Sequence, residues 1–216
     1  MKAYSIILLT FSLLGCQSTP IKSDINQHNY TQNTDDALWQ YSWVASQYQA
    51  AEALQKKFSG YNNFTIKPTI TVSKNSDIDE ETKQRFIKHL EQQTQLKLSQ
   101  YKSFQAEPGE RTLAIQFAIS NFERPNSVLA TTSTILPIGL GISAVSKAIT
   151  GEHTNVVKAQ IEVMISDSQT GEQIFSAIDI RTGEKGWDNI SDPDKQIIKI
   201  IDNWILSLIK TIDSEK

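Results

Sequence analysis

The sequence predicts an α+β fold: a mostly antiparallel four- to five-stranded sheet with two amphipathic helices packed on one face. Three observations lead to this prediction. Segments 156–166 and 173–181 alternate apolar and polar side chains around a turn, segment 111–122 alternates in the same way, and segment 193–211 repeats apolar residues at helical spacing. Alternation is typical of strands with one buried face, and the helical repeat produces an apolar stripe that can cover that face.

Residues 37–59 combine aromatic and small apolar side chains. The stretch from Ala51 to Lys57 predicts a short helix. The large apolar residues in this region either cover one edge of the core or form a surface for a partner, and core packing is the interpretation that we favour. These residues are Leu38, Trp39, Tyr41, Trp43 and Tyr48.

A strand and a helix are expected next. The strand runs from Asn63 to Ser73, and Pro68 predicts an edge position or a bulge because proline has no backbone N–H. Ser76 and Asp77 are the expected caps of the following helix. The apolar side of the strand consists of Phe64, Ile66, Ile70 and Val72, and the inward stripe of the helix consists of Phe86, Ile87, Leu90 and Thr94.

The centre of the predicted sheet comes from three longer strands. A short strand at 101–104 and a Pro-Gly turn at 107–110 precede the strand from Arg111 to Phe122. The strands from Val156 to Ser166 and from Gln173 to Arg181 form a hairpin. The side chains expected to face the core are Leu113, Ile115, Phe117, Ile119, Val157, Ala159, Ile161, Val163, Ile165, Ile174, Ile178 and Ile180, whereas Lys158, Gln160 and Glu162 are expected to face away.

The last predicted element is a helix from about Pro193 to Thr211. Ser191 or Asp192 is expected to cap it, and proline suits the first helical turn. Its apolar stripe is broad, which favours packing on the sheet. A helix lying on a membrane surface is the alternative, but acidic residues share its polar face with lysines.

The beginning of the chain has the pattern of a bacterial lipoprotein signal. A basic residue, Lys2, and an apolar stretch precede Leu13-Leu14-Gly15-Cys16. This pattern predicts cleavage between Gly15 and Cys16 and attachment of diacylglycerol to the Cys16 thiol. An ordinary signal peptide or an N-terminal membrane helix is the alternative, although the apolar stretch is well short of the ~20 residues that span a bilayer.

The predicted domain organisation follows from this signal. Residues 1–15 are the lipoprotein signal peptide, residues 16–36 are the lipidated cysteine and a polar flexible tether, and residues 37–216 are a single α+β periplasmic domain. Gln17 follows the lipidated cysteine, where an Asp would favour retention in the inner membrane. The expected location is therefore the outer membrane, with the domain facing the periplasm.

Composition excludes several classes of function. The formal charge is −3, and removing residues 1–15 removes one lysine and makes it −4. A nucleic-acid-binding surface would be basic, so no nucleic-acid partner is expected. Cys16 is the only cysteine, so neither an internal disulfide nor a cysteine zinc site is possible within this chain. No cofactor is expected.

Residues 125–146 carry no charged side chain, although they lie between two predicted strands. One interpretation is a buried loop and short helix that close one end of the sheet. The other is a surface for self-association, for a partner protein or for the membrane, because an exposed apolar patch of this size is unusual. The candidate interaction surface consists of Val128, Leu129, Ile135, Leu136, Ile138 and Ile142.

No catalytic or metal-binding residues are predicted. The three histidines, His28, His89 and His153, are not spaced as metal ligands, and no nucleophile or phosphate-loop motif occurs. The carboxylate pairs Asp77/Asp79 and Asp192/Asp194 are each at an expected helix start, where capping explains them. We therefore do not expect an enzyme, and an envelope hydrolase is kept only as an alternative.

Several motifs together resemble the bacterial lipoprotein family called domain of unknown function 3313. The resemblance covers roughly residues 60–212 and is strongest between 111 and 186. It implies a fold and an envelope location, but no activity. Its motifs are Pro125–Leu129, Leu136–Gly139, Ile149–Gly151, Ala159–Glu162, the turn Asp167–Glu172, Arg181–Glu184 and the final helix with Trp204.

The expected function is that of an outer-membrane-anchored lipoprotein acting as a non-enzymatic binding, assembly or accessory module of the cell envelope. Its expected partners are the membrane, through the lipid on Cys16, and an envelope protein or a second copy of the chain. A self-associating, membrane-associated oligomer formed through residues 128–149 is the first alternative.

Overall fold

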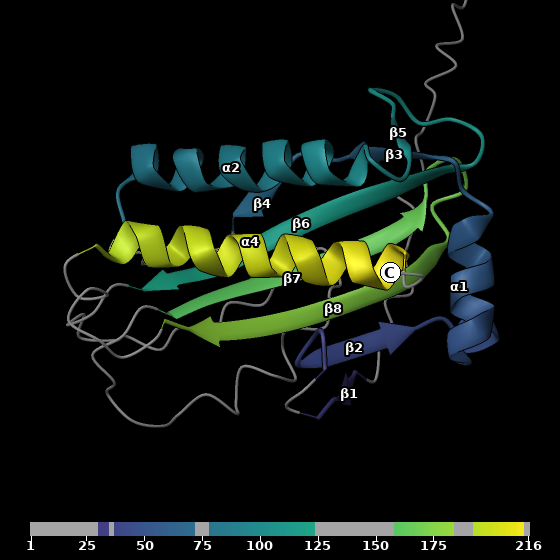
Figure 1. Cartoon of the computed structure of the whole chain (residues 1–216), viewed down its shortest axis with the longest axis horizontal. Coiled ribbons are helices and arrows are strands. Elements are labelled where there is room, and N and C mark those ends of the chain that lie inside the picture. Colours follow the sequence, from purple (N-terminus) through teal and green to yellow (C-terminus); the bar gives the residue numbers. More distant parts are fainter. Residues whose placement is uncertain (1–29, 35–36, 72–77, 124–157, 184–191, 214–216) are drawn as a thin grey trace, which may run out of the picture.

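The structure is a computed structural model that describes residues 30–34, 37–71, 78–123, 158–183 and 192–213. Within these residues, eight strands form one sheet, and three α-helices and one 3-10 turn accompany it (Figure 1). The strands are β1 (Thr31–Gln32), β2 (Tyr41–Val44), β3 (Asn63–Ile66), β4 (Ile70–Thr71), β5 (Ser103–Phe104), β6 (Thr112–Glu123), β7 (Lys158–Asp167) and β8 (Gln173–Thr182). The helical elements are η1 (Ser46–Tyr48), α1 (Ala51–Ser59), α2 (Glu80–Leu98) and α4 (Pro193–Ile212).

The sheet is mixed, and its strand order is β1-β2-β8-β7-β6-β3-β5, with β4 also paired to β6. The pairs among β1, β2, β8, β7 and β6 are antiparallel, whereas β3, β4 and β5 pair in parallel. The predicted four- to five-stranded, mostly antiparallel sheet with two helices is therefore wrong, and only the broad α+β class stands. The additional strands are two to four residues long, too short to show alternation in the sequence.

The hairpin of β7 and β8 and the long strand β6 form the centre of the sheet, as predicted (Figure 1). Apolar side chains of β6 and β7 that occupy paired positions share one face of the sheet, because cross-strand neighbours point the same way. The paired residues are Ile115 with Ile165, Phe117 with Val163, and Ile119 with Ile161. All of them are buried in the core between sheet and helices.

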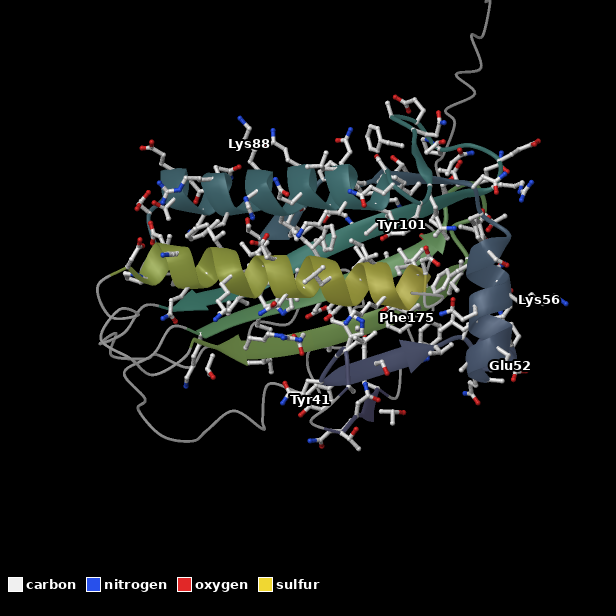
Figure 2. All side chains as sticks on the ribbon, in the orientation of Figure 1. Tyr41, Glu52, Lys56, Lys88, Tyr101 and Phe175 are labelled. Carbon is white, nitrogen blue, oxygen red and sulfur yellow. The ribbon has the colours of Figure 1, made fainter. Side chains whose placement is uncertain are left out.

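Helices α2 and α4 lie side by side across this face, and α1 stands at one end of the sheet (Figure 1). Phe86 and Leu90 of α2 and Ile201 and Trp204 of α4 are fully buried against the strands. The opposite side of each helix is polar: Lys88 projects outward from α2, and Glu52 and Lys56 project outward from α1 (Figure 2). This separation of apolar and polar sides is what the helical periodicity predicts.

The expected strand from Asn63 to Ser73 is divided around Pro68 into β3 and β4. Ile66 pairs with Ile115, but Ile70 pairs with Ala118, so four residues on one strand match three on the other. A shift of one residue moves the following side chains to the other face. Ile70 is therefore not on the face of Phe64 and Ile66, as the sequence predicts. Residues 72 and 73 lie outside the described residues.

The hairpin turn between β7 and β8 requires glycine at one position. Gly171 has φ +73°, and its N–H donates to the carbonyl oxygen of Asp167 at 3.0 Å. Gly171→Ala should destabilise the domain by about 1 kcal/mol, because a Cβ disfavours the left-handed region. Urea denaturation measures this change. Gly109→Ala is the matched control, since its Cβ would meet only the Thr112 hydroxyl at an ordinary 3.4 Å, and an equal loss in both variants would contradict the prediction.

None of the helices in the described part of the chain is both long and apolar enough to span a membrane.

Candidate functional site

The site residues that the sequence predicts fall outside the described part of the chain. These are Gly15 and Cys16 of the signal, and Val128, Leu129, Ile135, Leu136, Ile138 and Ile142 of the uncharged segment. Their predicted roles remain predictions.

The carboxylates considered as catalytic pairs are engaged in structural contacts where the structure describes them. Asp79, rather than Ser76 or Asp77, caps α2 by accepting a hydrogen bond from Thr82 N at 2.8 Å. Asp192 caps α4 by accepting from Lys195 N at 3.0 Å. Asp77 lies outside the described residues. The interpretation of Asp79 and Asp192 as helix-start residues agrees with this geometry.

The one histidine within the described residues also makes a structural contact. His89 of α2 contacts Asp202 of α4, with 2.9 Å between Nε2 and Oδ1, which joins the two helices. His28 and His153 lie outside the described residues. Across the described ranges, no three His, Cys, Asp or Glu side chains are grouped so that they could hold a metal ion.

A half-open cleft of about 140 Å³ lies between the end of β8 and the first half of α4. Its strand wall consists of Arg181, Thr182 and Gly183, and its helix wall consists of Gln196, Lys199, Ile200 and Asn203. The helix residues recur at intervals of three and four, so they share one side of α4. The cleft is therefore built by local periodicity on the helix and by the end of a strand.

Arg181 is held in place by a buried carboxylate two residues earlier on the same side of β8. Its Nε donates to Asp179 Oδ2, and the Asp179 side chain is only 6% exposed. Trp204 Nε1 donates to the same oxygen at 2.8 Å, and the Gln40 N–H donates to Asp179 Oδ1 at 3.1 Å. We call Asp179, Arg181, Trp204 and Gln40 the Asp179 network. It joins β8, α4 and the segment before β2.

The face of β8 that carries this network differs from the prediction. Asp179 pairs with Ile161 and Arg181 with Ala159, so both point toward the helices. Ile178 pairs with Glu162 and points to the opposite face. Because Ile174, Ile178 and Ile180 are the large apolar residues of this strand, hydrophobicity alone predicts that they face the core. Asp179 and Arg181 occupy the face toward the helices because each of them has a hydrogen-bond partner there.

The helix wall of the cleft contains two amide side chains. Gln196 is 7% exposed, and its side chain lines the cleft without a hydrogen bond to any described residue. Asn203, two turns later, is partly exposed and also lines the cleft. Both amides are therefore available to a bound group.

The electrostatics of the cleft favour an acidic group. Among the described residues, its lining includes two cationic side chains and no carboxylate. The acidic residues of the first half of α4 are engaged elsewhere: Asp194 contacts Arg85 at 2.6 Å, and Asp202 contacts His89. The arrangement is suited to binding.

A second unusual group lies on the opposite face of the sheet. Glu162 of β7 is completely buried, and neither carboxylate oxygen has a hydrogen-bond partner. Burial raises the pKa of Glu162 to about 9. Nearby on this face, Tyr30 Oη donates to Ser176 Oγ at 3.0 Å, and burial raises the pKa of Tyr30 to about 12. Glu162 is therefore neutral at pH 7, and it faces away from the helices as predicted, although this side of the strand is also buried.

Sequence reasoning missed the cleft and the Asp179 network. Asp179 and Arg181 stand two apart in a strand, which places them on one face, and this spacing was the available signal. Gln196 and Asn203 could not be recognised, because polar residues at the border of an apolar stripe are common on helices.

The comparison with protein families gives one match: the family described as protein of unknown function DUF3313 matches residues 44–205. The chain belongs to this family. The resemblance predicted from the sequence is thereby confirmed. The matched region contains every described residue that lines the cleft, and it adds no activity to them. No curated protein matches the chain.

Solved structures share a limited likeness with this DUF3313 member. A PelC dodecamer structure from Paraburkholderia phytofirmans has a TM-score of 0.32 and 10% identity, and the match covers 67% of this chain and 89% of that chain. The hypothetical protein CT253 from Chlamydia trachomatis has a TM-score of 0.43 and 7% identity, covering 72% and 99%. A DUF4136 family protein from Bacteroides thetaiotaomicron has a TM-score of 0.39 and 14% identity, covering 86% and 99%.

Proposed function

We propose that this DUF3313 member is a lipid-anchored, non-enzymatic binding or assembly module of the bacterial cell envelope. The observation that carries the location is the sequence Leu13-Leu14-Gly15-Cys16 after a basic residue and an apolar stretch. The acyl chains on Cys16 hold the domain at the membrane, because each buried methylene contributes about 0.8 kcal/mol. Gln17 favours the outer membrane, with the domain facing the periplasm.

The geometry of the described domain supports binding as the activity. The cleft at Arg181 presents donor groups on two walls, and the Asp179 network fixes one of these walls before any ligand arrives. A preorganised site loses less conformational freedom on binding. Attachment to a membrane also raises the effective concentration of the module near other envelope components.

Cys16→Ser should abolish acylation, because the serine hydroxyl cannot replace the thiol that accepts diacylglycerol. Growth of the host with labelled palmitate, followed by membrane fractionation, measures both the label and the location. The expected result is an unlabelled and uncleaved or soluble protein. Ser18→Ala is the matched control, since it lies beside the signal and leaves the cysteine in place. Label on the Cys16→Ser protein equal to that on the unmodified sequence would refute the anchor.

A further inference from the structure

We propose that one edge of the sheet lies against the membrane surface, an inference that rests on the proposed lipid anchor. We call residues 30–34 and 37–48 the β1–β2 edge, because they contain strands β1 and β2 and the 3-10 turn η1. The proposed occupant of this edge is the headgroup region of the bilayer, in contact with Tyr41 and Trp43 of β2. In Figure 1 the edge lies at the bottom of the view, with α2 at the top.

Two aromatic side chains of β2 are directed away from the helices. Tyr41 pairs with Ile178, which points to the face opposite the helices, and Trp43 pairs with Ser176 on that same face. Both aromatic side chains are half-buried, and within the described residues neither is part of the core cluster between sheet and helices, whereas Trp39 is. The core therefore does not explain why this face of β2 carries two aromatic residues.

The β1–β2 edge carries almost no charge, unlike the opposite side of the domain. Asp35 and Asp36 are the only charged side chains between residues 30 and 51, and they lie outside the described residues. Figure 2 shows Lys88 projecting outward from α2 on one side, with Tyr41 on the other. Tyrosine and tryptophan are enriched at membrane–water interfaces, because an apolar ring with a polar tip suits that boundary. The edge therefore suits a lipid surface, and its contact should not depend on anionic lipid, which attracts cations.

The described chain joins the sheet at this edge. Tyr30 Oη donates to Ser176 Oγ at 3.0 Å, and the next two residues form β1, which pairs with β2. Thirteen residues, 17–29, therefore separate Cys16 from Tyr30. Even when fully extended, thirteen residues reach only about 45 Å. The proposed anchor therefore holds the β1–β2 edge, before any later part of the chain, near the bilayer.

The contact with lipid does not need high affinity. Two aromatic side chains alone would bind a membrane weakly, but the acyl chains on Cys16 make this second contact intramolecular. The β1–β2 edge then has only to orient the domain. This orientation turns the charged outer side of α2 away from the bilayer (Figure 2).

The test measures which side of the acylated full-length protein contacts lipid. Cys16 is the only cysteine and carries the lipid, so an introduced cysteine is the single reactive thiol. Gln32→Cys places a fluorophore beside Tyr41, because Gln32 is exposed and pairs with Tyr41. Lys88→Cys is the matched control, since Lys88 is exposed on α2 (Figure 2). In phosphatidylcholine vesicles that contain nitroxide-labelled lipid, we expect quenching of the label at residue 32 and none at residue 88.

A second pair of variants tests the aromatic contact itself. Tyr41→Asp should abolish the quenching at residue 32, because a carboxylate that enters the headgroup region loses part of its hydration. Tyr101→Asp is the matched control, since Tyr101 is an exposed tyrosine that follows the end of α2. Circular dichroism of each variant separates lost contact from lost folding.

Several outcomes would overturn the proposal: no quenching at residue 32, equal quenching at residues 32 and 88, or unchanged quenching in Tyr41→Asp. Quenching that requires phosphatidylglycerol would also overturn it, because the edge offers no cation to anionic lipid. Protection of the label only in membranes that contain other proteins would identify a protein partner in place of lipid. Mass spectrometry before reconstitution tests the acylation of Cys16, so failure of the edge contact is distinguishable from failure of the anchor.

Discussion

Glu162→Met is expected to stabilise the domain at neutral pH, and the gain should increase as the pH rises. Glu162 lies fully buried at the centre of the sheet, between Ala118 and Ile178 on the neighbouring strands. Neither of its oxygens has a hydrogen-bond partner, which costs roughly 1–3 kcal/mol for each unsatisfied group. Methionine fills a similar volume with an apolar side chain, so it removes this cost.

The direction of the pH dependence follows from the pKa of Glu162. Burial raises it from 4.5 to about 9, so between these values the folded state retains a proton that the unfolded state releases. The unfolded state then binds fewer protons, and the free energy of unfolding falls as the pH rises. The slope is up to about 1.4 kcal/mol per pH unit. The fall in the free energy of unfolding begins near pH 4.5 and is complete above about pH 9.

Urea denaturation at several pH values between 5 and 8 measures both effects. The slope contributed by Glu162 should be absent in Glu162→Met and in Glu162→Gln, because neither side chain titrates. Glu162→Gln separates titration from polarity, since it retains a buried polar group and should stabilise less than methionine. Glu52→Gln is the control, as Glu52 is exposed on α1 (Figure 2). The same pH slope in the unmodified protein and in Glu162→Met would show that Glu162 is ionised when folded.

Periodicity predicted the long elements of the fold because apolar residues recur along each of them at strand or helix spacing. The strands β6, β7 and β8 begin and end within about two residues of their expected limits, and α4 begins at Pro193 as predicted. Alternation needs several residues to be visible, and β1, β4 and β5 have only two each. Their pairing is decided by neighbouring strands that lie far away in the sequence, so the mixed sheet could not be derived from local pattern.

The burial of polar residues was the second feature that could not be predicted from the sequence. Hydrophobicity assigns Asp179, Arg181 and Glu162 to water, yet Asp179 and Glu162 are buried and Arg181 is half-buried. Asp179 is buried with partners from three segments, and these partners become visible only when β8, α4 and residue 40 are brought together. The cleft could not be predicted for the same reason, because its strand wall depends on the Asp179 network. The cap of α4 was easier to predict, since Asp192 acts within its own turn.

Asp179→Ala is expected to destabilise the domain by about 3–5 kcal/mol, the usual cost of breaking a buried ion pair from one side. The substitution would leave three donors without their acceptor: Arg181 Nε, Trp204 Nε1 and the Gln40 N–H. It would also leave the guanidinium charge without its buried counter-ion. Because these donors belong to β8, α4 and the segment before β2, one carboxylate stabilises the packing of all three.

Trp204→Phe provides the matched comparison for Asp179→Ala. Phenylalanine keeps most of the buried aromatic volume of Trp204 and removes the Nε1–H, so the expected loss is smaller, about 1–3 kcal/mol. The double variant should lose less than the sum of the single changes, because both remove the same hydrogen bond. Chemical denaturation measures the three free energies of unfolding at one pH. Additive losses would contradict the shared network, since they would mean that Asp179 and Trp204 stabilise the domain independently.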